Sequence, residues 1–115
     1  MSITRHGVGA RMSQAVVHAG TVYLAGQVAD DTSVGVAGQT EQVLAKIDAQ
    51  LAAAGTDKSK LLSAQLWITD MASFNEMNAV WDAWVTPGET PVRACVEATL
   101  AAPQYRVEIM VTAAA

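Results

Sequence analysis

The sequence carries little charge and almost no cysteine. Only 16% of its 115 residues are charged, against roughly 25% in average soluble domains. The seven Lys and Arg residues are scattered, and the net charge is −4. Because nucleic-acid binding needs a positive surface that meets the phosphates, this charge pattern argues against nucleic acid as a partner.

The sequence also lacks the features of a secreted or membrane protein. A single cysteine, Cys95, excludes an intramolecular disulfide and favours a reducing compartment. No apolar run approaches the roughly 18 residues of a membrane span. The stretch from Met1 to Met12 has no continuous apolar region of the kind found in secretory signals. We therefore expect a cytoplasmic protein.

Metal and cofactor motifs are missing as well. The two histidines, His6 and His18, have no cysteine or carboxylate at the spacing of metal ligands. Gly35 and Gly38 alone do not make a phosphate-binding loop. The sequence predicts neither a metal site nor a bound cofactor.

Apolar residues, in contrast, are abundant. They make up 51% of the chain, whereas a domain of this size buries only about two-thirds of its unfolded surface. A subunit interface is one use for the excess, because large interfaces resemble protein cores. The alternative is an alanine-rich monomer, since alanine raises the hydrophobic count without much burial. No repeat, linker or low-complexity segment divides residues 1–115, which we treat as one domain.

The first half of the chain predicts a hairpin followed by a helix. Strands are expected at 13–19 and 21–29, joined at Ala19-Gly20, because glycine tolerates a positive φ. The turn-rich segment 30–38 precedes a helix at 39–54. Its apolar spacing of three and four residues defines one face, and Gly55 follows as a C-terminal cap; the face consists of Leu44, Ile47, Leu51 and Ala54.

The second half predicts a strand, a helix and two further strands. Residues 61–69 alternate between apolar and polar. Ser73 and Glu76 have the spacing of a capping box at the start of a helix that Pro87-Gly88 ends. Alternating strands follow at 92–99 and 106–112. The order ββαβαββ predicts an α+β domain, with a mixed or antiparallel sheet covered on one face by two helices.

Arg93 is the most informative polar residue. It lies inside a predicted strand, where a buried guanidinium is costly unless an anion meets it, and a guanidinium binds a carboxylate through two parallel hydrogen bonds. If the last two strands form an antiparallel hairpin, Glu108 can lie on the same face, and Glu97 is a second candidate partner. The pattern alone leaves two interpretations open: a structural Arg–Glu pair on an exposed face, or a binding site.

Cys95 and the tryptophans have plainer interpretations. Cys95 shares a face with Arg93, and a guanidinium can lower the pKa of a thiol. A free cysteine is more often a small buried apolar side chain, so we do not expect a nucleophile. Trp81 and Trp84, at helical spacing, are expected to anchor the core or an interface.

Several blocks of the sequence resemble the reactive intermediate deaminase, or YjgF-like, family. The resemblance covers nearly the whole chain, and the stretches 81–85 and 91–93 are closer to a divergent branch typified by the bacterial protein YoaB. The matching blocks are Ser13-Gln14-Ala15-Val16-Val17, Ala25-Gly26-Gln27-Val28, Phe74-Asn75-Glu76-Met77-Asn78, Pro91-Val92-Arg93-Ala94-Cys95-Val96-Glu97 and Arg106-Val107-Glu108-Ile109.

The resemblance implies a chorismate-mutase-like fold, assembled as a homotrimer with sites in clefts between subunits. It implies hydrolysis of enamine or imine intermediates to 2-keto acids and ammonia without a cofactor. The carboxylate-binding arginine of the family falls on Arg93 and the water-positioning glutamate on Glu108. Two further site residues fall on Asn78 and Cys95.

The chain also departs from the family pattern. Met12 stands where the family has a tyrosine, and Ala25 stands where it has a serine. The proline after the arginine strand is displaced to Pro103, next to Ala102. Because two hydroxyl groups are lost at site positions, these departures bear on the substrate more than on the reaction.

Three other functions compete with deamination. A non-catalytic 2-keto-acid-binding or regulatory protein would keep Arg93 but gain nothing from a carboxylate facing its ligand. A chorismate mutase would need several cationic groups, and the sequence offers one convincing arginine. An endoribonuclease activity, proposed for relatives, is unattractive at a net charge of −4.

Overall fold

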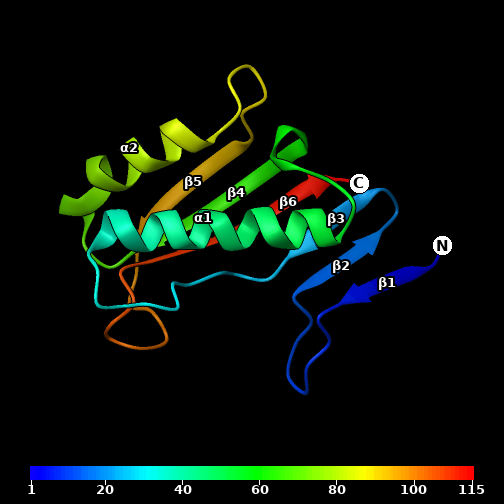
Figure 1. The fold of residues 1–115 in the computed structure, drawn as a ribbon, viewed down its shortest axis with the longest axis horizontal. Helices are drawn as coiled ribbons and strands as arrows, with labels where there is room; N and C mark the ends of the chain where they lie inside the picture. The colour runs from blue at the N-terminus through cyan, green and yellow to red at the C-terminus, as the bar shows by residue number, and fades with distance from the viewer.

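The computed structural model describes residues 1–115 as one six-stranded mixed sheet with both long helices on one face (Figure 1). The strand order is β1-β2-β3-β6-β4-β5. The predicted α+β class is therefore confirmed. The elements are β1 Ile3–His6, β2 Ala15–His18, β3 Thr21–Leu24, α1 Val36–Ala53, η1 Lys58–Lys60, β4 Leu61–Ile68, η2 Met71–Ser73, α2 Phe74–Trp84, β5 Val92–Glu97 and β6 Val107–Ala114.

The sequence did not predict β1, so the observed order is βββαβαββ. This strand pairs antiparallel with β2 at the edge of the sheet, with Ile3 opposite His18 and His6 opposite Ala15. None of its four residues is buried. A strand with no buried face lacks the alternation by which strands are recognised in a sequence.

The predicted hairpin is confirmed, with Val17 opposite Val22. Its turn uses Ala19 at φ 51° and Gly20 at φ 81°, both in the left-handed region that glycine tolerates best. β3 ends earlier than predicted, at Leu24. Beyond it, only an isolated bridge between Gln27 and Ile109 continues the pairing with β6.

Helix α1 begins three residues earlier than predicted and lies across the sheet. Its buried face includes Leu44, Ile47 and Leu51, as the spacing predicted. It ends at Ala53, and Gly55 follows with a φ of 84°, the left-handed conformation expected of a C-terminal cap. The core lies between the two helices and the inner face of the sheet, and α2 contributes Met77 and Trp81 to it.

The predicted capping box at α2 is wrong. The Ser73 side chain makes no capping hydrogen bond, because Ser73 has φ −87° and ψ 1° rather than an extended backbone. The short helix η2 takes over the helix start. Asp70 Oδ1 accepts a hydrogen bond from Ala72 N at 2.9 Å, and Glu97 Oε1 accepts one from Met71 N at 2.9 Å.

The last two strands do not form a hairpin, because β4 lies between them. β5 pairs parallel with β4, and β6 pairs antiparallel with β4 on its other side. Helix α2 makes the crossover that a parallel pair requires. Since residues opposite each other across strands share a face, these pairings decide which side chains meet.

Candidate functional site

Arg93 lies on the helix-covered face of the sheet, at its β5 edge. Its register partner on β4 is the buried Ala64, which points toward the helices. The guanidinium Nη1 donates to Asn78 Oδ1 at 2.7 Å. Its Cζ lies 5.3 Å from the ring centroid of Trp81 and 5.9 Å from that of Phe74. Helix α2 thus supplies every contact described for this guanidinium.

No carboxylate of the chain pairs with Arg93. The salt bridge found in the structure joins Lys46 to Asp30 at 3.0 Å, in another part of the molecule. Glu97, the second candidate partner, instead accepts the hydrogen bond of Met71 N. The structural Arg–Glu pair considered from the sequence does not form within one chain.

Cys95 shares the helix-covered face with Arg93, as expected. It is half-buried, in register with Leu66, and packs against the core. Burial raises the pKa of the Cys95 thiol, and the charge of Arg93 opposes that rise only in part. The thiol is therefore protonated at neutral pH, which disfavours it as a nucleophile.

Glu108 lies on the opposite, open face of the sheet. It is in register with Trp67 on β4, and its neighbours Val107 and Ile109 are fully buried on the helix side. Its carboxylate packs on Gly26: a Cβ at that position would lie 3.1 Å from Glu108 Cδ and would collide with Oε2. Glycine at position 26 therefore makes room for the carboxylate.

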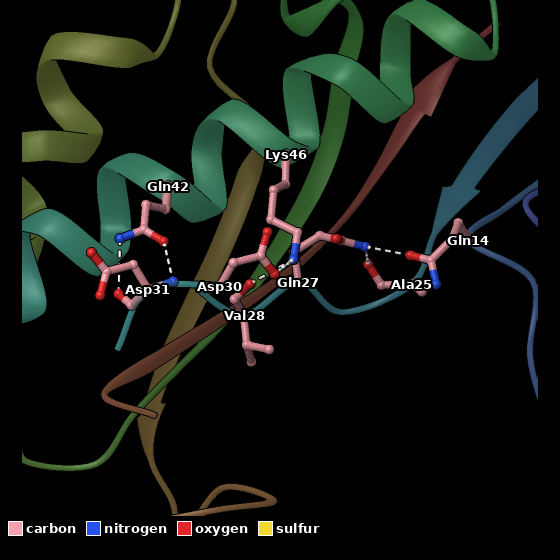
Figure 2. A network of polar contacts seen from close by, with 8 residues as sticks. All are labelled: Gln14, Ala25, Gln27, Val28, Asp30, Asp31, Gln42 and Lys46. Carbon is pink, nitrogen blue, oxygen red and sulfur yellow. Dashed lines mark hydrogen bonds and ion pairs between the residues drawn. The ribbon is translucent and has the colours of Figure 1, made fainter. Parts of the chain in front are cut away.

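The Ala25–Gln27 segment beside Glu108 is held by amide hydrogen bonds (Figure 2). Gln27 is only 4% exposed, and its Nε2 donates to Gln14 Oε1 at 3.1 Å and to Ala25 O at 3.0 Å. The Gln27 backbone bridges to Ile109. Gln14 and Gln27 belong to the blocks that resemble the family, but sequence reasoning assigned them no role in the site.

Helix α1 holds residues 28–31, which follow this segment, through side-chain hydrogen bonds. Lys46 Nζ donates to Val28 O and to Asp30 Oδ1, each at 3.0 Å (Figure 2). The Gln42 amide pairs with both backbone groups of Asp31 at 2.9 Å. The segment against which Glu108 packs is therefore tied to the helix layer.

The predicted site residues fall into two groups within one chain. The first, here called the arginine half-site, contains Arg93, Asn78 and Cys95 on the helix-covered face. The second, here called the glutamate half-site, contains Glu108 with the segment that begins at Ala25. Met12 belongs to the exposed loop between β1 and β2, two residues before Gln14.

Sequence reasoning missed two aromatic residues of the arginine half-site. Phe74 and Trp81 flank Asn78 along α2, at spacings of four and three residues. That spacing puts all three side chains on one helical face. It was available in the sequence, where Trp81 was expected only as a core or interface anchor, and its burial at 5% exposure agrees with that expectation.

Neither half-site resembles a metal centre. No group of three or more His, Cys, Asp or Glu side chains in the structure is arranged to hold an ion. None of the helices combines the length and the apolar character needed to cross a membrane.

Comparison with known proteins gives consistent matches along the chain. The family described as Endoribonuclease L-PSP matches residues 3–115. A RutC family protein of Haemophilus ducreyi is 47% identical over 112 residues, covering 97% of this chain and 96% of its own. RutC family protein YoaB of Escherichia coli K12 is 42% identical over 114 residues, covering 99% of both.

Solved structures agree with these matches. The crystal structure of NMB1025, a YjgF family member from Neisseria meningitidis, has a TM-score of 0.96 and 48% identity over 99% of this chain and 95% of its own. Rv2704 of Mycobacterium tuberculosis, of the YjgF/YER057c/UK114 family, has a TM-score of 0.90 at 26% identity, covering 99% and 100%. The resemblance expected from the sequence is confirmed, and the chain belongs to the YjgF-like family, which is also described as Endoribonuclease L-PSP and RutC, with YoaB among its relatives.

Proposed function

We propose that this protein is a cytoplasmic enamine/imine deaminase that converts 2-imino acids to 2-keto acids and ammonia, working as a homotrimer with its sites between subunits. One observation carries the proposal. Arg93 and Glu108 lie on opposite faces of the sheet, and neither forms a salt bridge within the chain. Each half-site therefore offers one group of a carboxylate-and-water site and lacks the other.

A second copy of the chain can supply the missing half. The open face of the sheet is not covered by either helix, and it exposes large apolar side chains that a subunit interface would bury. This arrangement agrees with the sites between subunits that the family resemblance implies. The exposed apolar side chains on this face include Tyr23, Val92, Val96 and Met110, at 47%, 74%, 45% and 41%.

Hydrolysis of an imine requires few catalytic groups from the protein. The carbon of a protonated imine is already electrophilic, so the site needs to fix the substrate and place one water. Arg93 binds the carboxylate through its planar fork. Glu108 takes a proton from the water as the water oxygen bonds to the imine carbon, and it then returns this proton to the nitrogen of the resulting amino alcohol. The C–N bond then breaks, ammonia leaves, and the hydroxyl proton is lost to give the keto acid.

The alternatives account for fewer of these features. A 2-keto-acid-binding protein would use Arg93, but it would leave Glu108 and the packing of its carboxylate on Gly26 without a role. RNA cleavage, which the family description suggests, would require phosphate contacts, and the net charge of −4 with scattered basic residues does not provide a surface for them.

A coupled assay tests the activity. An amino-acid oxidase generates imines from a panel of amino acids, and the disappearance of each imine is followed with and without the protein. The proposal requires faster hydrolysis of at least one imine. Sedimentation equilibrium tests the assembly: we expect about three times the 12.0 kDa chain mass, and a mass of 12.0 kDa would rule the trimer out.

Mixed oligomers test whether the site is shared. Arg93→Ala and Glu108→Gln are each expected to be inactive alone. In a random mixture with one residue from each neighbour, about a quarter of the sites regain both groups. Co-expression should therefore restore activity to roughly that fraction of wild type. A mixture as inactive as its parents would mean that one chain supplies both residues.

A further inference from the structure

We infer that Phe74 and Trp81 are positioning residues that hold the Arg93 guanidinium in place without neutralising its charge, and that an amide rather than a carboxylate at position 78 is what keeps this charge available. The inference rests on the proposed function, because it names how Arg93 is prepared for a substrate carboxylate. It assigns a role to two aromatic side chains outside the predicted site.

The three residues form one stripe on α2. Phe74, Asn78 and Trp81 are four and three residues apart, so they follow each other along a single helical face. That face lies over β5, where Arg93 is located. One helix therefore places two rings and one amide oxygen against a single guanidinium.

The rings hold the guanidinium without using its hydrogen-bond donors. A cation within about 6 Å of an aromatic centroid is attracted to the ring face, and Arg93 Cζ lies 5.3 Å from Trp81 and 5.9 Å from Phe74. A guanidinium has five N–H donors. The structure uses one nitrogen, Nη1, in the bond to Asn78, so donors are left for a bidentate carboxylate.

The choice of amide matters because of its charge. Asn78 Oδ1 accepts at 2.7 Å but is neutral. An aspartate would be nearly the same shape and would place a negative charge at the same distance. It would compete with a substrate carboxylate for the fork and lower the net charge of the half-site. The structure instead surrounds Arg93 with neutral groups.

Ligand binding by matched variants tests the inference. Pyruvate is titrated into wild type, Asn78→Asp, Trp81→Leu, Trp81→Phe and Trp84→Leu by calorimetry, and folding is checked by circular dichroism. We expect Asn78→Asp to remain folded and to bind pyruvate at least about tenfold more weakly. We expect Trp81→Leu to weaken binding severalfold and Trp81→Phe, which keeps a ring, to stay near wild type.

Trp84→Leu is the matched control. Trp84 lies on the same helix and packs against Trp81, with ring centroids 5.4 Å apart, but it donates Nε1 to Asp48 at 3.0 Å and makes no contact with Arg93. This variant therefore tests whether loss of a neighbouring ring alone affects binding. It should leave pyruvate affinity unchanged. The inference is wrong if folded Asn78→Asp binds pyruvate like wild type, or if Trp81→Phe and Trp81→Leu lose affinity equally. In turnover, KM should rise for Trp81→Leu while kcat changes little.

A spectroscopic reading separates this inference from the proposed function. The NMR signal of the Arg93 Nε–H group should be displaced by the ring current of position 81 in wild type and Trp81→Phe. It should move toward the free-arginine position in Trp81→Leu. This comparison needs no ligand or turnover, so it decides the positioning role even if no imine proves to be a substrate. An unchanged signal in all three proteins contradicts the inference.

Discussion

Arg93 and Glu108 belong to the same sheet but point to opposite sides of it: Arg93 lies beside Ala64 under the helices, and Glu108 lies beside Trp67 on the open face. Arg93 is on β5 and Glu108 is on β6, and the strand β4 lies between these two strands. Within one chain, the sheet itself therefore lies between these two groups. This geometry is what makes a shared site between subunits the simplest use of both residues.

Replacing Arg93 should abolish activity and spare the fold. Arg93→Ala removes a charge-assisted bidentate contact worth about 3 kcal/mol or more, which corresponds to a hundredfold or greater loss in rate. Arg93→Lys should rescue poorly, because an ammonium lacks the planar fork. Imine hydrolysis and pyruvate binding measure the effect. If Arg93→Ala binds pyruvate as wild type does, Arg93 is not the carboxylate anchor.

Replacing Glu108 should separate binding from turnover. Glu108→Gln keeps the shape and hydrogen bonding of the side chain but cannot take a proton from water, so turnover should fall by about 10²- to 10⁴-fold. Pyruvate affinity should survive, in contrast to Arg93→Ala. Wild-type turnover in Glu108→Gln would move water activation to a backbone carbonyl or to the substrate itself.

Gly26→Ala should impair turnover through Glu108. The added methyl group collides with the Glu108 carboxylate, so either this carboxylate or the Ala25–Gln27 backbone must shift. We expect turnover to fall at least about tenfold, since small displacements of catalytic groups are costly. Gly35→Ala is the control, because a Cβ there meets nothing within 4 Å and its φ is −76°. Equal activity in both variants would contradict the close packing.

Cys95 should react slowly and be dispensable. Its thiol pKa is raised above the ordinary 9.0 by burial, so alkylation by iodoacetamide should be slow at pH 7 and should still be rising with pH at pH 9. Because the folded-state pKa is the higher one, the stability linked to the protonated thiol is present below the unfolded pKa and is lost as pH rises through the folded pKa. Cys95→Ala should keep substantial hydrolysis. A covalent adduct trapped on Cys95 during turnover would overturn this.

The start of α2 should depend on Asp70 and not on Ser73. Asp70→Ala removes the acceptor of Ala72 N and should lower the free energy of unfolding by about 1 kcal/mol. Ser73→Ala should change it by much less, since the Ser73 side chain caps nothing. Denaturation midpoints of the two variants compare these effects directly. A larger loss in Ser73→Ala would restore the capping box.

The sequence by itself determined the elements with a buried face. Apolar spacing predicted α1 through Leu44, Ile47 and Leu51, and alternation predicted the inner residues of β6 and those of β4 from Ala64 onward. Leu62, which the alternation placed on the same face, is exposed, because the register between β4 and β6 shifts between Leu61 and Ser63. Both patterns reflect local geometry, because side chains repeat every 3.6 residues in a helix and every two in a strand. The residue blocks also determined the family, and with it the expected importance of Arg93 and Glu108.

Only the tertiary structure decided which side chains meet. β1 has no buried residue to mark it, and the backbone of Ser73 is set by the turn before it, so local patterns failed at both places. Strand pairing is a long-range choice: inserting β4 between β5 and β6 separated Arg93 from Glu108 and brought α2 over β5. Periodicity along one strand says which residues share its face, but a neighbouring strand's identity depends on the packing of the whole sheet.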